Sequence, residues 1–247
     1  MTQNGRRRGP EGGYLVFDIE TEIDKELVRG AFYPDPEVTA ELAYERFRCK
    51  YDGGFLPVTV HAPVSIVLGW VTPGRVLERL QVLRAEEAGE ESLVREFWRA
   101  VAPFKGVLVT FSGRIFDIPV MELRALHYGL SLPWHFATKS GFRGRNDRHD
   151  DLYDVMSNRG AARLRGGLDL LSKLVGLPGK GAVSGAMVQS LWESGEYDTV
   201  HRYCRRDVIQ TYYLFLHIER LRGRVDSSEL RRIEEATRQF RVELDGG

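Results

Sequence analysis

The sequence predicts an α/β protein, and three observations lead to this expectation. Its 247 residues fit one ordinary α/β domain, or one domain with an appendage. Hydrophobic residues make up 43% of the chain, which is enough to build a sizeable core. Short apolar runs typical of buried strands occupy the N-terminal half, whereas helical periodicity dominates the C-terminal half. No internal repeat or clear linker divides these elements into two domains.

Four segments in the first half read as strands. They comprise residues 14–19, 65–71, 76–83 and 107–111. The first is a short apolar run that ends at carboxylates. Between it and the second strand, residues 22–63 form a long insertion, which is either a substrate-contacting lid or a surface embellishment.

The helices are predicted from their apolar periodicity. We expect them over residues 37–48, before residue 101 and after an acidic bend at 86–91, and over 117–127, 152–157, 168–175, 183–193, 199–221 and 226–241. Asp117 stands at the N-cap position of its helix, and Gly129 is a stop signal. We therefore divide the chain into a disordered tail (1–13), one domain (14–222) and a charged helical tail (223–247).

The C-terminal helix carries an apolar face. Its Leu230, Ile233 and Phe240 could pack back onto the domain or onto a second subunit, so self-association through this helix is one expectation. The sequence leaves both arrangements open.

Charge and targeting signals narrow the class of protein. Lysine and arginine together number 35, as do aspartate and glutamate, so any phosphate-binding surface must arise from uneven placement of charge. Cys49 and Cys204 lack the spacing of a zinc site or a disulfide framework. With neither a secretion signal nor an apolar run near the roughly 20 residues of a membrane helix, we expect a cytoplasmic protein without membrane contact.

Asp18 and Glu20 form an acidic pair at the end of the first predicted strand. Because side chains alternate along a strand, residues two apart point to the same side of the sheet. Carboxylates are the ligands that hard cations such as Mg²⁺ prefer, and nucleases with two metal ions need several of them. Taken alone, this pair reads more simply as a solvated strand end.

Three further residues matter by their position. Asp117 begins a predicted helix, where a capping role is the simplest interpretation. Tyr203 and Asp207 are four apart on a predicted helix and therefore lie on one face, which alone would indicate little. It is the occurrence of all three patterns in this order that favours a metal-dependent site.

The three motifs resemble those of a known enzyme family. They are Leu15-Val16-Phe17-Asp18-Ile19-Glu20-Thr21, Ser112-Gly113-Arg114-Ile115-Phe116-Asp117-Ile118-Pro119 and Tyr203-Cys204-Arg205-Arg206-Asp207. The segments His149-Asp150-Asp151-Leu152-Tyr153-Asp154 and Leu177-Pro178-Gly179-Lys180 add to the likeness. Over residues 14–220 the chain resembles DEDDy-type 3′-5′ exonucleases of the ribonuclease H-like superfamily, above all the stand-alone exonucleases related to the proofreading domain of family-B DNA polymerases. This resemblance implies a central mixed β-sheet flanked by helices.

The resemblance also implies a role for each residue. Asp18, Glu20 and Asp207 would bind the catalytic Mg²⁺ or Mn²⁺, with Asp18 bridging to a second ion that Asp117 holds through water. Tyr203 would orient the attacking water, since a phenol is neutral near pH 7 and suits positioning better than proton removal. Two such ions activate the water and stabilise the leaving oxygen.

Substrate contacts follow from the same motifs. The resemblance places the terminal nucleotide against Ile19, Thr21, Ser112, Gly113 and Phe116. The family usually has asparagine where this chain has Ser112, and a serine reaches less far and lacks the amide donors, so this contact is expected to be weaker. The metal ligands are all present.

A basic segment at residues 139–148 offers a second substrate contact. Arg143 and Arg145 could neutralise phosphates, and a base could stack on Phe142. A solvated loop without a function explains the same composition equally well.

We therefore expect a hydrolase that removes nucleotides from the 3′ end of DNA, most simply single-stranded DNA, and releases nucleoside monophosphates. The length leaves no room for a polymerase domain, so a proofreading or DNA repair role would be exercised as a separate protein. Two alternatives remain open, an exonuclease that trims RNA and a nucleic-acid-binding module that retains the fold without catalysis.

Overall fold

The structure, a computed structural model, describes residues 9–52, 54–137, 141–143, 147–179, 181 and 183–245. Its centre is a five-stranded mixed sheet with the order β3-β2-β1-β4-β5. The strands are β1 (Tyr14–Ile23), β2 (His61–Val71), β3 (Leu77–Arg84), β4 (Val107–Thr110) and β5 (His149–Asp151). β1 pairs antiparallel with β2 and parallel with β4, and β4 pairs parallel with β5. The expected α/β class and the central mixed sheet flanked by helices are confirmed.

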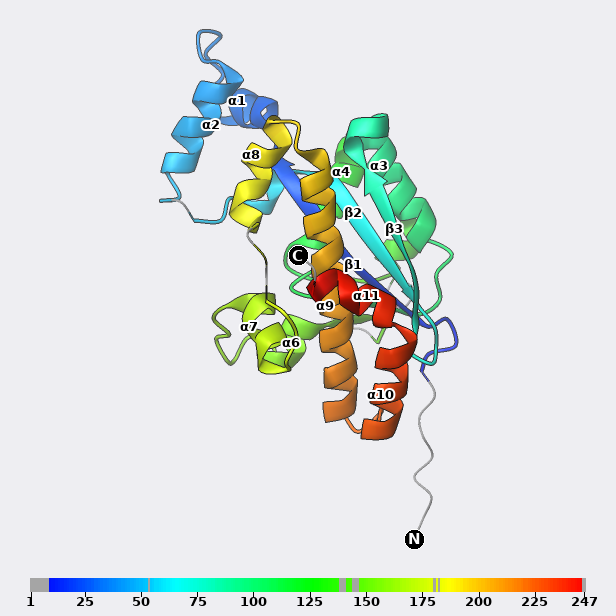
Figure 1. Cartoon of the computed structure of the whole chain (residues 1–247). Coiled ribbons are helices and arrows are strands. Elements are labelled where there is room, and N and C mark those ends of the chain that lie inside the picture. The colour runs from blue at the N-terminus through cyan, green and yellow to red at the C-terminus, as the bar shows by residue number, and fades with distance from the viewer. Residues whose placement is uncertain are drawn as a thin grey trace.

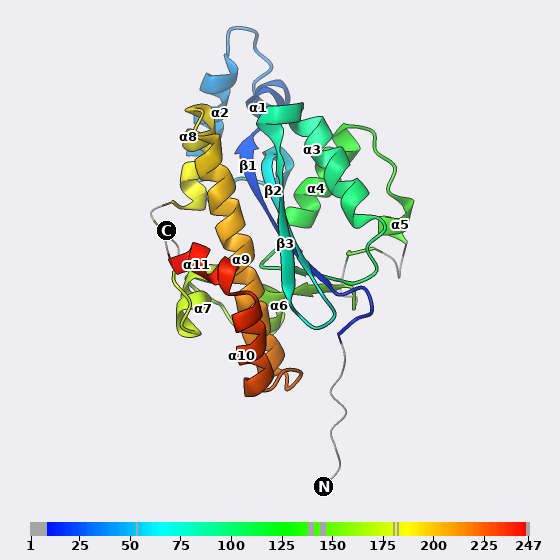
Figure 2. The same ribbon diagram turned by 45° about the vertical axis from the view of Figure 1, so that its right-hand side comes forward.

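The helices that follow the chain order surround this sheet. They are α1 (Lys25–Phe32), α2 (Ala40–Cys49), α3 (Ala85–Val101), α4 (Asp117–His127), α5 (Pro133–Phe136), α6 (Leu152–Met156), α7 (Gly167–Leu174), α8 (Val188–Glu193), α9 (Tyr197–Leu221), α10 (Ser227–Ala236) and α11 (Arg238–Asp245), with 3-10 turns η1 (Val58–Val60) and η2 (Gly185–Met187). In Figures 1 and 2, α9 runs along one face of the sheet, and α3 and α4 cover the other.

The alternation of side chains along β1 assigns each residue to a face. Leu15, Phe17 and Ile19 are buried in the core beneath α3 and α4. Tyr14 and Val16 belong to the core beneath α9. Because strand side chains alternate, Asp18 and Glu20 continue the α9 face toward the carboxyl end of β1.

The insertion between β1 and β2 builds a small core of its own. Val28 from α1 packs with Ala43, Tyr44 and Phe47 from α2 and with Leu56. The expected helix over 37–48 corresponds to α2, but α1 and the turn η1 were not predicted. In Figure 1, α1 and α2 lie beside α8 at one end of the molecule.

The C-terminal helices pack against their own chain. Leu230, Ile233, Phe240 and Leu244 are buried in the same core as α9, and Tyr213 donates its hydroxyl to the carbonyl of Thr237. Of the two arrangements expected for this apolar face, the structure adopts the one within the domain. The predicted single helix over 226–241 is two helices that meet at Thr237.

Several predicted boundaries were wrong, for local reasons. β1 and β2 extend four residues further than expected, to Ile23 and back to His61, because a bulge between Glu20 and Thr21 lets the pairing continue past Pro63. Helix α3 begins at Ala85 and includes the acidic bend, with a non-helical break at Gly89. The predicted helix over 183–193 begins as the 3-10 turn η2 and is helical only from Val188.

Among the described helices, none combines the length and the apolar character needed to cross a membrane.

Candidate active site

The carboxyl half of β1 carries the first two acidic side chains. Glu20 is buried with 8% of its surface exposed, and Asp18 is partly buried. Both lie on the face that α9 covers. The strand β1 is covered by apolar neighbours on both faces, and at its carboxyl half it presents these two carboxylates to the first third of α9.

Helix α9 brings Cys204 to these carboxylates, and the charge of Asp207 on the same helix acts on Cys204 as well. The Cys204 thiol donates to the Asp18 carbonyl at 3.4 Å and lies 3.9 Å from Asp18 Oδ2. Potential ligand atoms of Asp18, Glu20 and Cys204 all lie within 4.8 Å of one another. Burial, and then the charges of Asp18 and Glu20, raise the pKa of the Cys204 thiol well above its usual range. Cys204 therefore stays protonated, and the ligands open to a hard cation are the carboxylates.

Asp117 joins the same centre from the start of α4. Its Oδ1 accepts the backbone N–H of Ile19 at 3.2 Å, which fixes it against the first motif. Burial is the main cause that raises the pKa of the Asp117 carboxyl to about 7; hydrogen bonds from its own N–H and from Ile19 lower it, and the charges of Asp151 and Asp207 raise it. Asp117 is therefore close enough to Asp207 for their charges to interact. Asp18 and Glu20 thus lie together at Cys204, and the charge of Asp207 acts on both Cys204 and Asp117.

The position of Asp117 in its helix differs from the prediction. Phe116 occupies the N-cap position, and Asp117 is the first helical residue with only 3% of its surface exposed. Its carboxylate accepts from its own N–H and from the N–H of Ile19 on the neighbouring strand. The capping interpretation was wrong, and the carboxylate points into the acidic centre.

The turn before Asp117 has an unusual backbone. Ser112 has a φ of 68°, in the left-handed region that non-glycine residues other than asparagine and aspartate rarely adopt. A Cβ on Gly113 would meet the Thr110 side chain at 2.6 Å, so only glycine fits there. Asparagine adopts this left-handed region more readily than serine does. The backbone alone would therefore favour the asparagine that the resemblance leads us to expect where this chain has Ser112, independent of any contact with a nucleotide.

The comparison with known proteins agrees with this geometry. A family model described as "Predicted 3'-5' exonuclease related to the exonuclease domain of PolB" matches residues 53–244. The chain belongs to this family. The matched segment contains Asp117, Tyr203 and Asp207 and begins after Asp18 and Glu20, whose place beside Cys204 comes from the structure.

Solved structures show the same fold. A family B DNA polymerase from the hyperthermophilic archaeon Pyrobaculum calidifontis matches with a TM-score of 0.54 and 17% sequence identity, over 83% of this chain and 24% of the polymerase chain. The exonuclease-family chain thus spans about a quarter of the length of that polymerase. No curated protein matches the present chain.

The predicted contacts from the basic segment are only partly as expected. Phe142 is fully buried against Trp134 and His135, so it cannot offer its ring to a base, and this prediction was wrong. Arg143 pairs with Glu122 at 3.0 Å, lies over the ring of Phe136 and keeps 52% of its side chain exposed. Arg145 lies outside the described residues.

An aromatic group beside the first two motifs was missed. Phe55 is 71% exposed and stacks on His61 at 5.2 Å, and both rings contact Phe116 at 5.0 Å. Burial lowers the pKa of the His61 ring, which keeps the ring neutral with a proton on one nitrogen only. Because Nε2 must donate to the Leu56 carbonyl, Nδ1 is the acceptor and receives the Thr21 hydroxyl at 2.7 Å. Phe55 is 61 residues from Phe116, so no local pattern could have joined them.

Proposed function

We propose that the protein is a 3′-5′ exonuclease that hydrolyses the terminal phosphodiester of single-stranded DNA with two Mg²⁺ or Mn²⁺ ions and releases nucleoside monophosphates. The observation that supports this proposal is that Asp18 and Glu20 lie together at Cys204, while Asp117 is bonded to Ile19 between them and the charge of Asp207 acts on both Cys204 and Asp117.

The donor set suits divalent cations that prefer oxygen. The Asp117 carboxyl, with its pKa raised to about 7 by burial and by neighbouring acids, is a group that a bound cation would stabilise in its charged form. Asp18, Glu20 and Asp207 would hold one ion, and Asp117 with Asp18 the other. When bound, such ions supply an activated water and charge stabilisation for the leaving oxygen.

The remaining residues orient the substrate. Tyr203 lies one helical turn before Asp207 on α9, where its hydroxyl would position the attacking water. Ile19 and Thr21 on β1, with Ser112, Gly113 and Phe116 in the second motif, border the terminal nucleotide. An unpaired base stacks on an accessible aromatic face. The exposed ring of Phe55 would therefore serve as the stacking platform, rather than the buried ring of Phe142. Such a surface suits a single-stranded 3′ end, of the kind that DNA repair or proofreading produces.

The test is digestion of a 5′-labelled single-stranded DNA oligonucleotide in Mn²⁺, with Asp18→Asn as the inactive variant. We expect stepwise shortening from the 3′ end, and a loss of about 10³-fold or more in kcat for Asp18→Asn, because removal of a ligand forfeits several kcal/mol of charge stabilisation. Asp198→Asn, whose side chain is 74% exposed on the same helix, is the matched control and should be fully active.

Two results would overturn the proposal in different ways. Binding of the oligonucleotide without release of monophosphates, unchanged in Asp18→Asn, would identify a binding module. Faster digestion of an RNA oligonucleotide of the same sequence would replace the substrate with RNA.

A further inference from the structure

We propose that Asp151, at the end of β5, is a positioning residue that places Asp117 for its cation. This inference rests on the proposed function, and it assigns to Asp151 no contact with the substrate or with a metal ion. It follows from where the two carboxylate oxygens of Asp151 are bonded and from how the second motif continues into α4.

The Asp151 carboxylate accepts hydrogen bonds from four backbone N–H groups. Its Oδ1 accepts from the N–H of Ser112 at 2.9 Å, and its Oδ2 accepts from the N–H of Arg114 at 2.9 Å. Oδ1 also caps α6 by accepting from Tyr153 at 3.0 Å and Asp154 at 3.4 Å. Three of these four N–H groups share Oδ1 and the fourth bonds Oδ2, and only 2% of the residue is exposed, so Asp151 is engaged by the backbone and better suited to positioning than to binding a metal ion.

These bonds hold the strained turn of the second motif. Ser112 keeps its left-handed backbone directly before two residues whose contacts are fixed, Gly113 against Thr110 and Arg114 against Asp151. Strained backbone of this kind persists only where the surroundings impose it. Without the Asp151 carboxylate, the turn would lose the acceptors on both sides of Gly113.

The turn is joined rigidly to Asp117. The N–H of Phe116 donates to the Ser112 carbonyl at 3.2 Å, and the N–H of Ile118 donates to the Gly113 carbonyl at 2.9 Å. Residues on both sides of Asp117 are therefore bonded to Ser112, which Asp151 holds, and to Gly113, which lies between the two residues that Asp151 holds. A shift of the turn must move the Asp117 carboxylate relative to Ile19 and Asp207.

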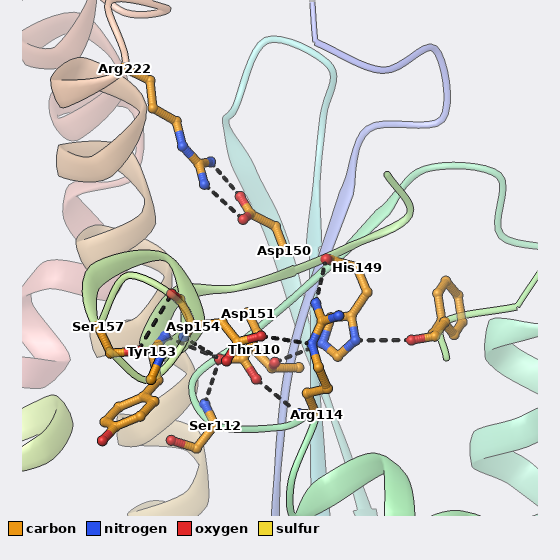
Figure 3. A network of polar contacts seen from close by, with 12 residues as sticks. Thr110, Ser112, Arg114, His149, Asp150, Asp151, Tyr153, Asp154, Ser157 and Arg222 are labelled. Carbon is orange, nitrogen blue, oxygen red and sulfur yellow. Dashed lines mark hydrogen bonds and ion pairs between the residues drawn. The ribbon is translucent and has the colours of Figure 1, made fainter. Parts of the chain in front are cut away.

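The Arg114 side chain adds a second clamp to the same turn. It donates to the His149 carbonyl at 3.1 Å and pairs with Asp154 at 3.1 Å, while His149 bonds Thr110 at 2.9 Å (Figure 3). Figure 3 shows Asp151 between Ser112 and Arg114, and Asp150 turned toward Arg222. The loop of the second motif is thus fastened to β5 and α6 from both ends.

The experiment compares Asp151→Asn with Asp226→Asn. Asparagine has one acceptor oxygen, and Ser112 and Arg114 use different oxygens of Asp151, so one of these two bonds is lost in either orientation of the amide. Asp226 caps α10 by accepting with Oδ1 from the N–H groups of Ser228 and Glu229, and one amide oxygen can accept both bonds, so Asp226→Asn is a matched carboxylate-to-amide change at a helix cap outside the second motif.

Two measurements separate a positioning role from loss of fold. We expect kcat on single-stranded DNA to fall by about 10²-fold in Asp151→Asn, with KM within about threefold, as is typical when a reacting group is displaced by about 1 Å. Titration with Mn²⁺, followed by electron paramagnetic resonance in the presence of oligonucleotide, should show two bound ions in the wild type and in Asp226→Asn, and one in Asp151→Asn. Circular dichroism establishes that each variant is folded.

The outcomes are distinct from those that test the function. An active wild type with Asp151→Asn retaining kcat within twofold and both ions would overturn the inference. A wild type that releases no nucleotides would sink the proposed function, while the Mn²⁺ titration would still decide whether Asp151 places Asp117. If Asp151→Asn does not fold, Arg114→Ala removes the second clamp and should lower kcat about tenfold at unchanged KM; an unchanged kcat would also overturn the inference.

Discussion

Two buried acids, Glu219 and Asp117, differ in the charges that surround them. Glu219, near the end of α9, has none of its side chain exposed and pairs with Arg75 at 2.8 Å, Arg224 at 2.9 Å and Arg222 at 3.1 Å. Asp117 is buried to a similar degree, and burial first, with the charges of Asp151 and Asp207 added to it, raises its pKa. The first acid is neutralised by the protein's own cations, whereas the second lies among like charges.

The difference separates a group that supports the fold from one that serves a ligand. A buried charge is tolerated when it is paired and hydrogen-bonded, as Glu219 is. A carboxyl that keeps its proton up to about pH 7 is stable in the absence of metal only because it is neutral. We infer that the arginine cluster around Glu219 (Arg75, Arg222 and Arg224) stabilises the fold with or without metal. The acidic centre formed by the four predicted metal ligands would gain its full stability when cations bind.

The largest expected effect on stability comes from Glu219→Ala. It leaves Arg75, which is only 4% exposed, as a buried charge without its Glu219 partner, and such a loss costs about 3–5 kcal/mol of the free energy of unfolding. Urea denaturation measures the cost, with Glu87→Ala, a surface acid 68% exposed, as the control within about 0.5 kcal/mol of wild type. kcat per folded molecule should not change, and a fall in kcat would mean that the two regions are not independent.

Asp117→Asn should have the opposite sign in metal-free protein. Because the folded pKa of Asp117 is raised to about 7 from an unfolded value near 4, the wild type loses stability as pH rises through this interval, when the unfolded chain has already released the proton. Asparagine has no such proton and can still accept from Ile19. In EDTA, Asp117→Asn should match the wild type near pH 4 and exceed it by up to about 4 kcal/mol at pH 8.

Thermal melting in EDTA at several pH values, repeated with Mn²⁺, measures this difference. Mn²⁺ at pH 8 should restore stability to the wild type more than to the variant, because the charged carboxylate is the ligand. Parallel pH profiles for the two proteins in EDTA would contradict the assignment of the raised pKa to Asp117.

The parts of the site that the sequence predicted depend on local periodicity. Asp18 and Glu20 share a face because strand side chains alternate, and Tyr203 and Asp207 share a face because a helix repeats every 3.6 residues. The C-terminal apolar face was likewise visible as a pattern. Which surface it covers was not, because that depends on tertiary packing against α9.

The features that the sequence did not predict depend on contacts between distant segments. Phe142 reads as an exposed aromatic in a basic loop, but it is buried because Trp134 and His135 fold over it. Asp117 reads as a helix cap, and its true partner is the N–H of Ile19, 98 residues away. The Asp151 bonds to the second motif likewise cross more than 30 residues. Composition and spacing cannot specify such pairs.

The smallest expected effect on the free energy of unfolding is that of Asp150→Asn. It tests the comparison between two consecutive residues of β5. Asp150 and Asp151 are adjacent on β5 and therefore face opposite sides, Asp150 toward the arginine cluster and Asp151 toward the acidic centre (Figure 3). Asp150 forms a two-pronged pair with Arg222, with one contact of 2.8 Å, and the two side chains are 17% and 22% exposed. Asp150→Asn should cost about 1 kcal/mol of the free energy of unfolding, because Arg222 keeps Glu219 as a partner.

Urea denaturation and kcat measured on the same preparations check this expectation. kcat should stay within twofold of wild type in Asp150→Asn, in contrast to its neighbour Asp151→Asn. If both variants lost kcat equally, the two aspartates would act as one charged unit, and the boundary between the arginine cluster and the acidic centre would not run through β5. If only Asp151→Asn lost kcat, the separation would hold between consecutive residues, which the alternation of strand side chains sends to different partners.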